Sequence, residues 1–147
     1  MDAEAMRAVL ARIPFTRHLD FQIERAADGD VRMTLPDSAA TRNLAGTVHA
    51  GTLYTFGETV AGVAAGLETL DRAFPFARRA EIHYRLPARG VVHGLARVDK
   101  RDVERVLEEL SREGRAELTV EVALQGPDGR TVAEMEVDYA FRPLEAA

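Results

Sequence analysis

The hydrophobic pattern of the chain is clearest between His49 and Leu70. Apolar side chains recur there in steps of three and four residues, which is the spacing of one helix face. They are Leu53, Phe56, Val60, Val63 and Leu67. Most other positions hold glycine or alanine, although each interior glycine costs about 1 kcal/mol of helix stability relative to alanine. So many small residues predict that another backbone packs very close to this helix, as a sheet wrapped around it would.

Six other stretches alternate between apolar and polar residues, which is the period of a half-buried strand. The first two are joined by Asp28 and Gly29, a pair typical of a two-residue hairpin turn. The last two are joined by the turn sequence QGPDGR, and one phase of the last places Met135, Val137 and Tyr139 on a common face. The predicted strands cover about residues 18–26, 31–36, 80–88, 91–98, 116–124 and 131–141.

Two shorter helices complete the predicted elements. Residues 2 to 12 have helical spacing of apolar positions, and Pro14 marks the end of that helix. The second is amphipathic, with Asp102 as its expected N-cap and Gly114 as its expected stop. We expect loops at residues 37–48 and near 71–76.

The order of these elements predicts an α+β fold in one domain, residues 1–147, with its core in residues 15–142. Six alternating strands and one long helix with a small-residue surface favour a curved antiparallel β-sheet wrapped around that helix. Such a sheet has exposed edge strands, and an exposed edge is a template for pairing with another chain. We therefore expect a homo-oligomer.

Composition and charge narrow the possible functions. The chain of 147 residues carries a formal net charge of −5, which argues against sequence-independent binding of nucleic acid, since that needs a basic surface. It contains no cysteine, which excludes a disulfide framework, thiolate metal sites and a cysteine nucleophile. The longest weakly polar run, Thr59 to Leu67, is far shorter than the roughly 20 residues of a membrane span. We expect a cytoplasmic protein with no membrane partner.

The start of the long helix is a candidate site for an anion or a polarised carbonyl. The first N–H groups of a helix lack intrahelical partners, and the helix dipole places partial positive charge there. In this sequence they belong to about Ala50, Gly51 and Thr52. Gly51 has no side chain to obstruct an approaching atom, so its N–H could stabilise a developing oxyanion.

Glu58, His49 and Asn43 are the other candidates for chemistry. Glu58 lies nine residues after His49, on the helix flank of Tyr54 and away from the apolar stripe. In a cleft, its carboxylate could activate water or attack an acyl carbon; the alternative is an exposed helix residue or an ion pair with arginine. His49 could cap the helix or orient a substrate, and Asn43 could position water or brace its loop.

Other kinds of site have little support. The spacing of His18, His83 and His93 matches no zinc pattern, and neither a Gly-x-Ser-x-Gly elbow nor a phosphate-binding loop is present. We expect no metal and no organic cofactor. The basic residues are nearly all arginine, and some in the middle strands, such as Arg85 and Arg89, could grip the phosphates of a substrate. Each of them could equally be an ordinary exposed residue.

The stretch NLAGTVHAGTLYTFGET, residues 43–59, resembles the signature of hot-dog-fold acyl-CoA thioesterases of the phenylacetate-pathway type. The residues that carry the resemblance are Asn43, Gly46, His49, Gly51 and Glu58. EIHYRLPARG, at residues 81–90, is similar to the third strand of that family. Ala50 stands where the family usually has glycine, and Glu58 where it commonly has aspartate. The sequence is most similar to a branch of the superfamily known only as domains of unknown function.

The resemblance implies a single hot-dog fold and hydrolysis of an acyl-CoA or acyl-carrier thioester. It implies Glu58 as nucleophile or general base, the Gly51 N–H as the group that polarises the carbonyl, and Asn43 and His49 as positioning residues. Substrate contacts would come from Ala50, Tyr54, Arg85 and Arg89. It further implies a dimer with active sites at the subunit boundary, or a tetramer of two such dimers, with CoA present only as part of the substrate.

Two alternatives remain on the same fold. The first is a dimer that binds an acyl group or CoA without catalysis. The second is a dehydratase that acts on acyl carrier protein thioesters, although the chain lacks the proline-rich loop those enzymes have at the helix start.

Overall fold

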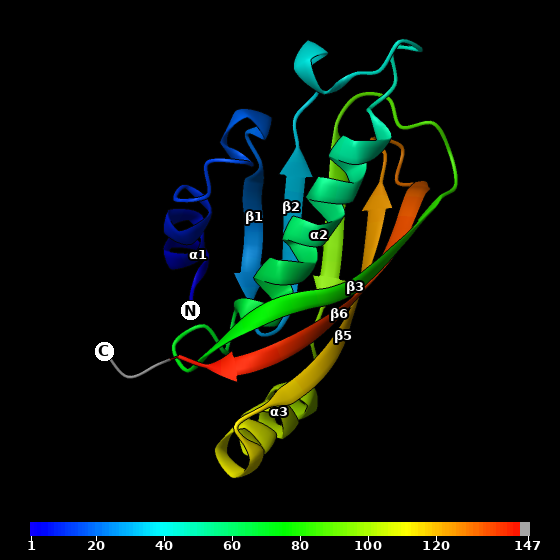
Figure 1. Ribbon diagram of the computed structural model, residues 1–147. Helices are drawn as coiled ribbons and strands as arrows, with labels where there is room; N and C mark the ends of the chain where they lie inside the picture. Colours follow the sequence, from blue (N-terminus) through cyan, green and yellow to red (C-terminus); the bar gives the residue numbers. More distant parts are fainter. Residues whose placement is uncertain (145–147) are drawn as a thin grey trace.

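A computed structural model describes residues 1–144 of the chain as one six-stranded antiparallel sheet with three α-helices (Figure 1). The strand order in the sheet is β1-β2-β4-β5-β6-β3. The strands are β1 (Gln22–Ala27), β2 (Asp30–Leu35), β3 (Ala73–Tyr84), β4 (Val92–Arg97), β5 (Ala116–Gln125) and β6 (Thr131–Pro143). The helices are α1 (Ala3–Leu10), α2 (Ala50–Gly66) and α3 (Lys100–Glu113), and short 3-10 turns cover Arg17–Leu19 and Ala39–Thr41.

The sheet curves around α2, as the sequence predicts (Figure 1). The apolar face of α2 meets the inward side chains of the strands, and the largest fully buried side chains of this core include Phe56, Val60, Met33, Leu124 and Phe141. This is a layered α+β arrangement with one hydrophobic cluster between sheet and helix.

Glycines set the short distance between α2 and the sheet. A Cβ added to Gly57 of α2 would lie 2.7 Å from the Met135 sulfur of β6. A Cβ added to Gly94 of β4 would lie 2.6 Å from a Val60 methyl group. Both distances are well inside normal contact. At Gly57 the nearest atom is the end of a flexible methionine, whereas at Gly94 it belongs to a stiff, buried valine. The close approach of sheet and helix that the small residues predict is found at these two positions.

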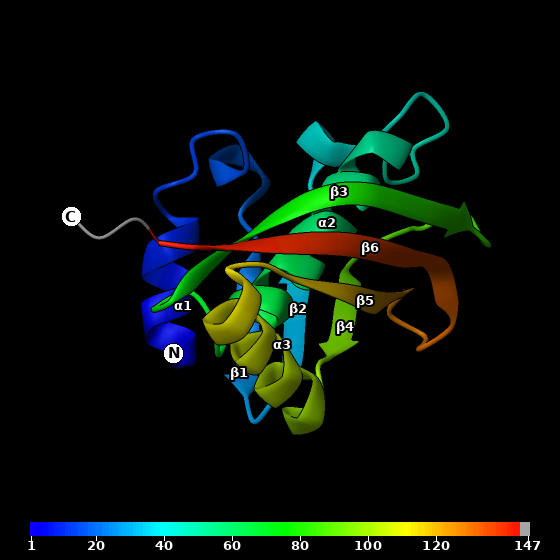
Figure 2. The same ribbon diagram turned by 60° about the horizontal axis from the view of Figure 1, so that its bottom comes forward.

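The two other helices lie outside this central layer. The helix α1 packs beside β1. The helix α3 lies between the end of β4 and the start of β5 and contacts β5 and β6 (Figures 1 and 2). Its buried side chains, Val106 and Leu110, belong to the same hydrophobic cluster as the inward side chains of those strands. That leaves β3 as the open edge strand of the sheet. No helix within residues 1–144 combines the length and the apolar character that crossing a membrane requires.

The first hairpin turn forms as predicted. Asp28 and Gly29 have φ angles of 55° and 79°, which are the positive values that a type I′ turn needs at both central positions. The strand before it is shorter than expected, because Leu19 lies in a 3-10 turn and β1 begins only at Gln22.

Two other boundaries differ from the prediction. The expected linker near 71–76 is wrong, because β3 begins at Ala73 and pairs along its whole length with β6. Pro75 lies inside it, and a strand tolerates proline at a sheet edge because no neighbour needs the missing N–H there. The helix α3 begins two residues before the expected N-cap: Asp99 is the capping residue and Asp102 lies in the first turn. Gly114 stops that helix with a φ of 67°, as predicted.

Candidate active site

The start of α2 is fixed by backbone contacts on two sides. The His49 N–H donates to the Thr41 carbonyl at 2.8 Å, and the Val48 N–H donates to the Ala88 carbonyl at 2.9 Å. These bonds join the loop before α2 to the 3-10 turn and to the segment that precedes β4. The helix therefore starts at a defined position beside the end of β3.

Asn43 braces this loop. Its side-chain oxygen accepts from the N–H groups of Ala45 and Thr47, at 3.0 and 3.2 Å, and its side-chain nitrogen donates to the Thr47 hydroxyl at 2.8 Å. Its backbone N–H also donates to the Thr47 carbonyl. Since both ends of the amide are engaged, the structure shows the bracing role for Asn43.

His49 caps α2 through its ring. Its Nδ1 atom accepts from the Gly51 N–H at 2.9 Å, so the proton of the neutral ring sits on Nε2. The His49 carbonyl accepts from the N–H groups of Thr52 and Leu53. Among the described residues, 1–144, the N–H of Ala50 at the helix start has no acceptor. The open donor expected here thus belongs to Ala50, while the Gly51 N–H is used by the cap.

A cavity of about 350 Å³ opens at this end of α2. Its walls come from the bracing loop, the first turn of α2 and the segment after β3, and they include Asn43, Val48, Ala50, Leu53, Tyr84 and Leu86. The Tyr84 hydroxyl donates to the Ala50 carbonyl at 3.0 Å and closes one side. The walls are largely apolar, with the unpaired Ala50 N–H at the helix start beside them.

Glu58 lies two turns further along α2. It is half-buried, and burial raises the pKa of its carboxyl above the ordinary value. Glu58 and Gly51 are seven residues apart, which places them within about 20° of each other around the helix and about 10 Å apart along it. They share one flank of α2, but Glu58 is not among the residues that line the cavity at the helix start.

Tyrosine side chains lie near both the cavity at the start of α2 and Glu58. Tyr54 precedes Glu58 by one turn and is 39% exposed. It raises the pKa of Tyr84, second to the effect of burial, so it lies near the tyrosine that closes the cavity. It also contributes to the raised pKa of Tyr139, after burial and after Glu58. Tyr54 lies four residues after Ala50 and four before Glu58, so these three residues follow one another along the same side of α2. We call this side, with the cavity at its start, the strip along the flank of α2.

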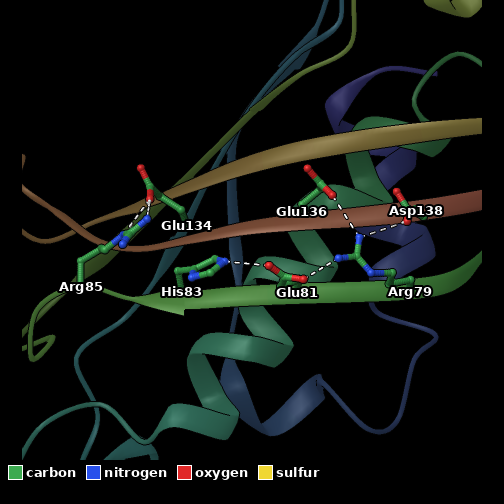
Figure 3. A network of polar contacts seen from close by, with 7 residues as sticks. All are labelled: Arg79, Glu81, His83, Arg85, Glu134, Glu136 and Asp138. Atoms are coloured by element: carbon green, nitrogen blue, oxygen red, sulfur yellow. Dashed lines mark hydrogen bonds and ion pairs between the residues drawn. The ribbon is translucent and has the colours of Figure 1, made fainter.

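Both arginines expected to contact the substrate have polar contacts within the chain. Arg85 pairs with Glu134 of β6 at 2.7 Å (Figure 3). Arg89 points to the bracing loop, with its guanidinium 3.5 Å from the Gly46 carbonyl. To bind phosphate, Arg85 would have to leave a carboxylate that already satisfies it.

Arg85, which follows the end of β3, also lines the cavity at the start of α2. Near its pair with Glu134, a separate polar network lies on the face of the sheet away from α2 (Figure 3). Arg79 of β3 reaches Glu136 at 3.2 Å and Asp138 at 3.4 Å and also pairs with Glu81, which accepts from His83 (Figure 3). Beside this network lies a hollow of about 790 Å³, whose walls combine charged side chains such as Arg32, Arg97 and Glu136 with apolar ones such as Leu95 and Ala123. Because the sheet separates it from Glu58 and from the helix start, it belongs to a different face. No group of three or more potential metal ligands occurs within residues 1–144.

The comparison with known proteins identifies the family. The model of the domain of unknown function DUF4442 matches residues 3–140. The chain belongs to the DUF4442 family. This confirms the resemblance to a branch of the hot-dog superfamily that is known only as a domain of unknown function. No protein with a curated description matches the chain.

Solved structures confirm the hot-dog fold of this DUF4442 protein. PA5026 from Pseudomonas aeruginosa, described as a probable thioesterase, superposes with a TM-score of 0.87 at 28% identity over 98% of this chain and 97% of its own. A protein of unknown function from Chlorobaculum tepidum also gives 0.87, at 16% identity over 95% and 93%. A mutant of the thioesterase PA1618 from Pseudomonas aeruginosa gives 0.78, at 17% identity over 98% and 96%.

Two residues of this DUF4442 site were not among the sequence candidates. Tyr84 closes the cavity, and Tyr139 contacts Glu58. A signal existed for Tyr139, because the alternation of its strand places it on the same face as Met135 and Val137. Its meeting with Glu58 could not be foreseen, since it joins positions 81 residues apart.

Proposed function

We propose that the protein hydrolyses an acyl thioester of the acyl-CoA or acyl-carrier class. The observation that carries the proposal is the strip along α2, where a half-buried carboxyl and the unpaired N–H of a helix start lie on one side of the helix, with a largely apolar cavity at the helix start. The similarity to PA5026 and to PA1618 supports the same class of reaction.

In the proposed reaction, the thioester carbonyl lies at the start of α2. Its oxygen accepts from the Ala50 N–H, and from the Gly51 N–H once the His49 ring turns away. Donors aimed at a developing oxyanion are usually the largest single contribution to such catalysis. Asn43 keeps the loop and the helix start in place, and Tyr54 lines the path toward Glu58.

Glu58 acts on water as a general base in this proposal. The carboxylate takes a proton from water as the water oxygen bonds to the carbonyl carbon, and the carbon–sulfur bond then breaks. The protonated Glu58 gives that proton to the leaving thiolate, so the products are a free acid and a thiol and the carboxylate is restored. Because burial raises the pKa of Glu58, its carboxylate is a stronger base toward water than a fully exposed glutamate would be.

A second copy of the chain would complete the site. The strand β3 is an open edge beside the flank that carries Glu58 and Tyr54, and such an edge pairs readily with another strand. We propose a homodimer joined along β3, in which the partner covers this flank and excludes water from it.

The test is release of free thiol from a panel of short, long and aromatic acyl-CoAs. Wild type, Glu58→Gln and a control, Glu68→Gln, are compared at equal concentration; Glu68 is an exposed carboxyl just beyond the end of α2. We expect release by wild type and by the control, and a loss of at least about a hundredfold in Glu58→Gln. If no substrate releases thiol, or if Glu58→Gln equals wild type, the proposal is wrong.

One observation favours a second candidate, which is a dimer that binds acyl groups without turnover. The Gly51 N–H is already bonded to His49, which removes one donor from the carbonyl site. Calorimetric titration with a non-hydrolysable thioether analogue of an acyl-CoA distinguishes the two. Binding of the analogue together with no thiol release from the matching thioester would favour the binding protein.

A further inference from the structure

The peptide group between Ala50 and Gly51 is held at both ends by side chains from different parts of the chain. Its carbonyl, on Ala50, accepts from the Tyr84 hydroxyl at 3.0 Å. Its N–H, on Gly51, donates to Nδ1 of the His49 ring at 2.9 Å. These two contacts differ in how firmly they hold the peptide group.

The carbonyl end is tied to the sheet. Tyr84 is the last residue of β3 and pairs with Ala133 of β6. A side chain on a strand is held more precisely than one on a loop. Because a peptide group is planar and trans, its N–H points away from its carbonyl. The contact of Tyr84 with the Ala50 carbonyl therefore helps to fix the direction of the Gly51 N–H, whether or not that N–H has an acceptor.

The ring of His49 is held more loosely. His49 is exposed, and among residues 1–144 the Gly51 N–H is the one group to which its ring is hydrogen-bonded. The ring lies directly against Gly51, since a Cβ there would be 3.2 Å from Nδ1 and 3.3 Å from Cε1. Exposed side chains change rotamer within picoseconds to nanoseconds, so the ring can turn outward once this single hydrogen bond breaks.

A substrate carbonyl at the helix start would compete with the ring for this donor. With the ring in place, the Ala50 N–H is the donor left open at the start of α2 in the described part of the chain, residues 1–144. With the ring turned away, the N–H groups of Ala50 and Gly51 are both open. Each donor aimed at a developing oxyanion adds to its stabilisation, so departure of the ring improves the site.

We propose that His49 is a displaceable block on the carbonyl site: its ring occupies the Gly51 N–H in the free protein and yields it to the thioester carbonyl, while Tyr84 keeps that N–H in position. The proposal rests on the proposed thioesterase function. It assigns to His49 a role opposite to that of a residue that positions the substrate. It also explains how a thioesterase can have this N–H already bonded before the substrate arrives.

The experiment compares His49→Ala with His49→Asn. Both variants remove the imidazole ring, and with it any contact between ring and substrate. Asparagine keeps a side-chain oxygen that accepts from the first N–H groups of a helix, whereas alanine has no such acceptor. The two variants therefore differ in whether the Gly51 N–H is still occupied. The readouts are kcat and KM for the acyl-CoA that the wild type hydrolyses fastest.

We expect kcat/KM of His49→Ala to exceed that of the wild type and that of His49→Asn by about two- to tenfold, because one hydrogen bond no longer has to be broken. A substrate-positioning histidine predicts the opposite, which is a fall in both variants. If kcat/KM of His49→Ala lies at or below that of the wild type or of His49→Asn, the block is refuted.

A second measurement uses the wild type alone, so it does not depend on the folding of either variant. The probe is the ketone analogue of acetyl-CoA in which a methylene group replaces the sulfur, which keeps the carbonyl and cannot release thiol. When the probe saturates the protein, the ¹⁵N resonance of His49 Nδ1 and the amide resonance of Gly51 should move together. The amide of Gly114, which donates to the Leu110 carbonyl at the end of α3, should stay in place.

The possible failures are distinguishable. Absence of thiol release by the wild type and by both variants refutes the proposed function and, with it, the block. Turnover with the wrong order of variants, or binding of the probe without a change at His49 Nδ1, refutes the block and leaves the thioesterase function standing.

Discussion

Replacement of Gly94 by alanine tests the close packing of the sheet on α2. A Cβ at this position would lie 2.6 Å from a Val60 methyl carbon and 3.1 Å from two atoms of the Phe56 ring, where ordinary carbon contacts are about 3.5–4.0 Å. Neither neighbour can move away easily, because both are fully buried. Val60 is also β-branched, and the χ1 angle of such residues is stiff in a helix.

The magnitude follows from two opposing effects. Alanine is favoured over glycine in a strand by roughly 0.5–1 kcal/mol. Overpacking of a tight core costs about 1–3 kcal/mol. Since the added carbon would stand well inside contact distance of a stiff, buried neighbour, the packing cost exceeds the backbone gain. We expect Gly94→Ala to lower the free energy of unfolding by about 1–2 kcal/mol.

Gly62→Ala is the matched control, with the opposite expected sign. It lies inside α2, and its added Cβ would meet only the Tyr139 hydroxyl, at 3.4 Å, which is ordinary contact. We expect it to raise stability by roughly 0.5–1 kcal/mol through helix propensity alone. Urea unfolding followed by circular dichroism measures both, with unchanged m-values as the sign that midpoints can be compared. If Gly94→Ala is as stable as wild type, the close approach of β4 to α2 is wrong.

Two further predictions concern the site. Burial raises the pKa of Glu58 in the folded protein, so the folded state favours the protonated carboxyl. The free energy of unfolding therefore falls as pH rises from the ordinary pKa of glutamate to the raised pKa of Glu58. Glu58→Gln should therefore be more stable than wild type at neutral pH and lose this advantage in acid; equal urea midpoints at both pH values would contradict it. Asn43→Ala should lower stability by about 1–2 kcal/mol and speed amide exchange at Thr47, while unchanged exchange there would refute the bracing role.

Local sequence was a good guide to the elements of the fold. The steps of three and four from Leu53 to Leu67 place α2, and the alternating stretches place the strands, because side-chain periodicity reflects which face is buried. The turn at Asp28 and Gly29 followed from turn chemistry alone. The small residues of α2 also revealed close packing, since few other reasons justify so many glycines in a helix.

The boundaries that failed depended on neighbours in space. Ala73 and Pro75 read as a linker because proline weakens a strand pattern, yet they pair with the far end of β6. Proline is tolerated there because β3 lies at the sheet edge, and the alternation of a strand does not show whether that strand will lie at an edge. Likewise, Asp99 rather than Asp102 occupies the N-cap position of α3, and its carboxylate accepts from Arg97 at the end of β4 instead of from the first N–H groups of the helix.

For the site, the local sequence was enough to show which residues gather at α2. Asn43, His49, Ala50, Gly51 and Glu58 lie on one short segment, so their order along the helix and its loop follows from the chain itself.

The contacts of these residues depend on the folded molecule. In it, the Gly51 N–H bonds to His49, Arg85 pairs with Glu134, and Tyr139 meets Glu58. A hydrogen bond or an ion pair requires distances of about 3 Å between two groups. For groups far apart in the chain, the register of the sheet and its distance from α2 set those distances, and no local pattern of residues encodes them.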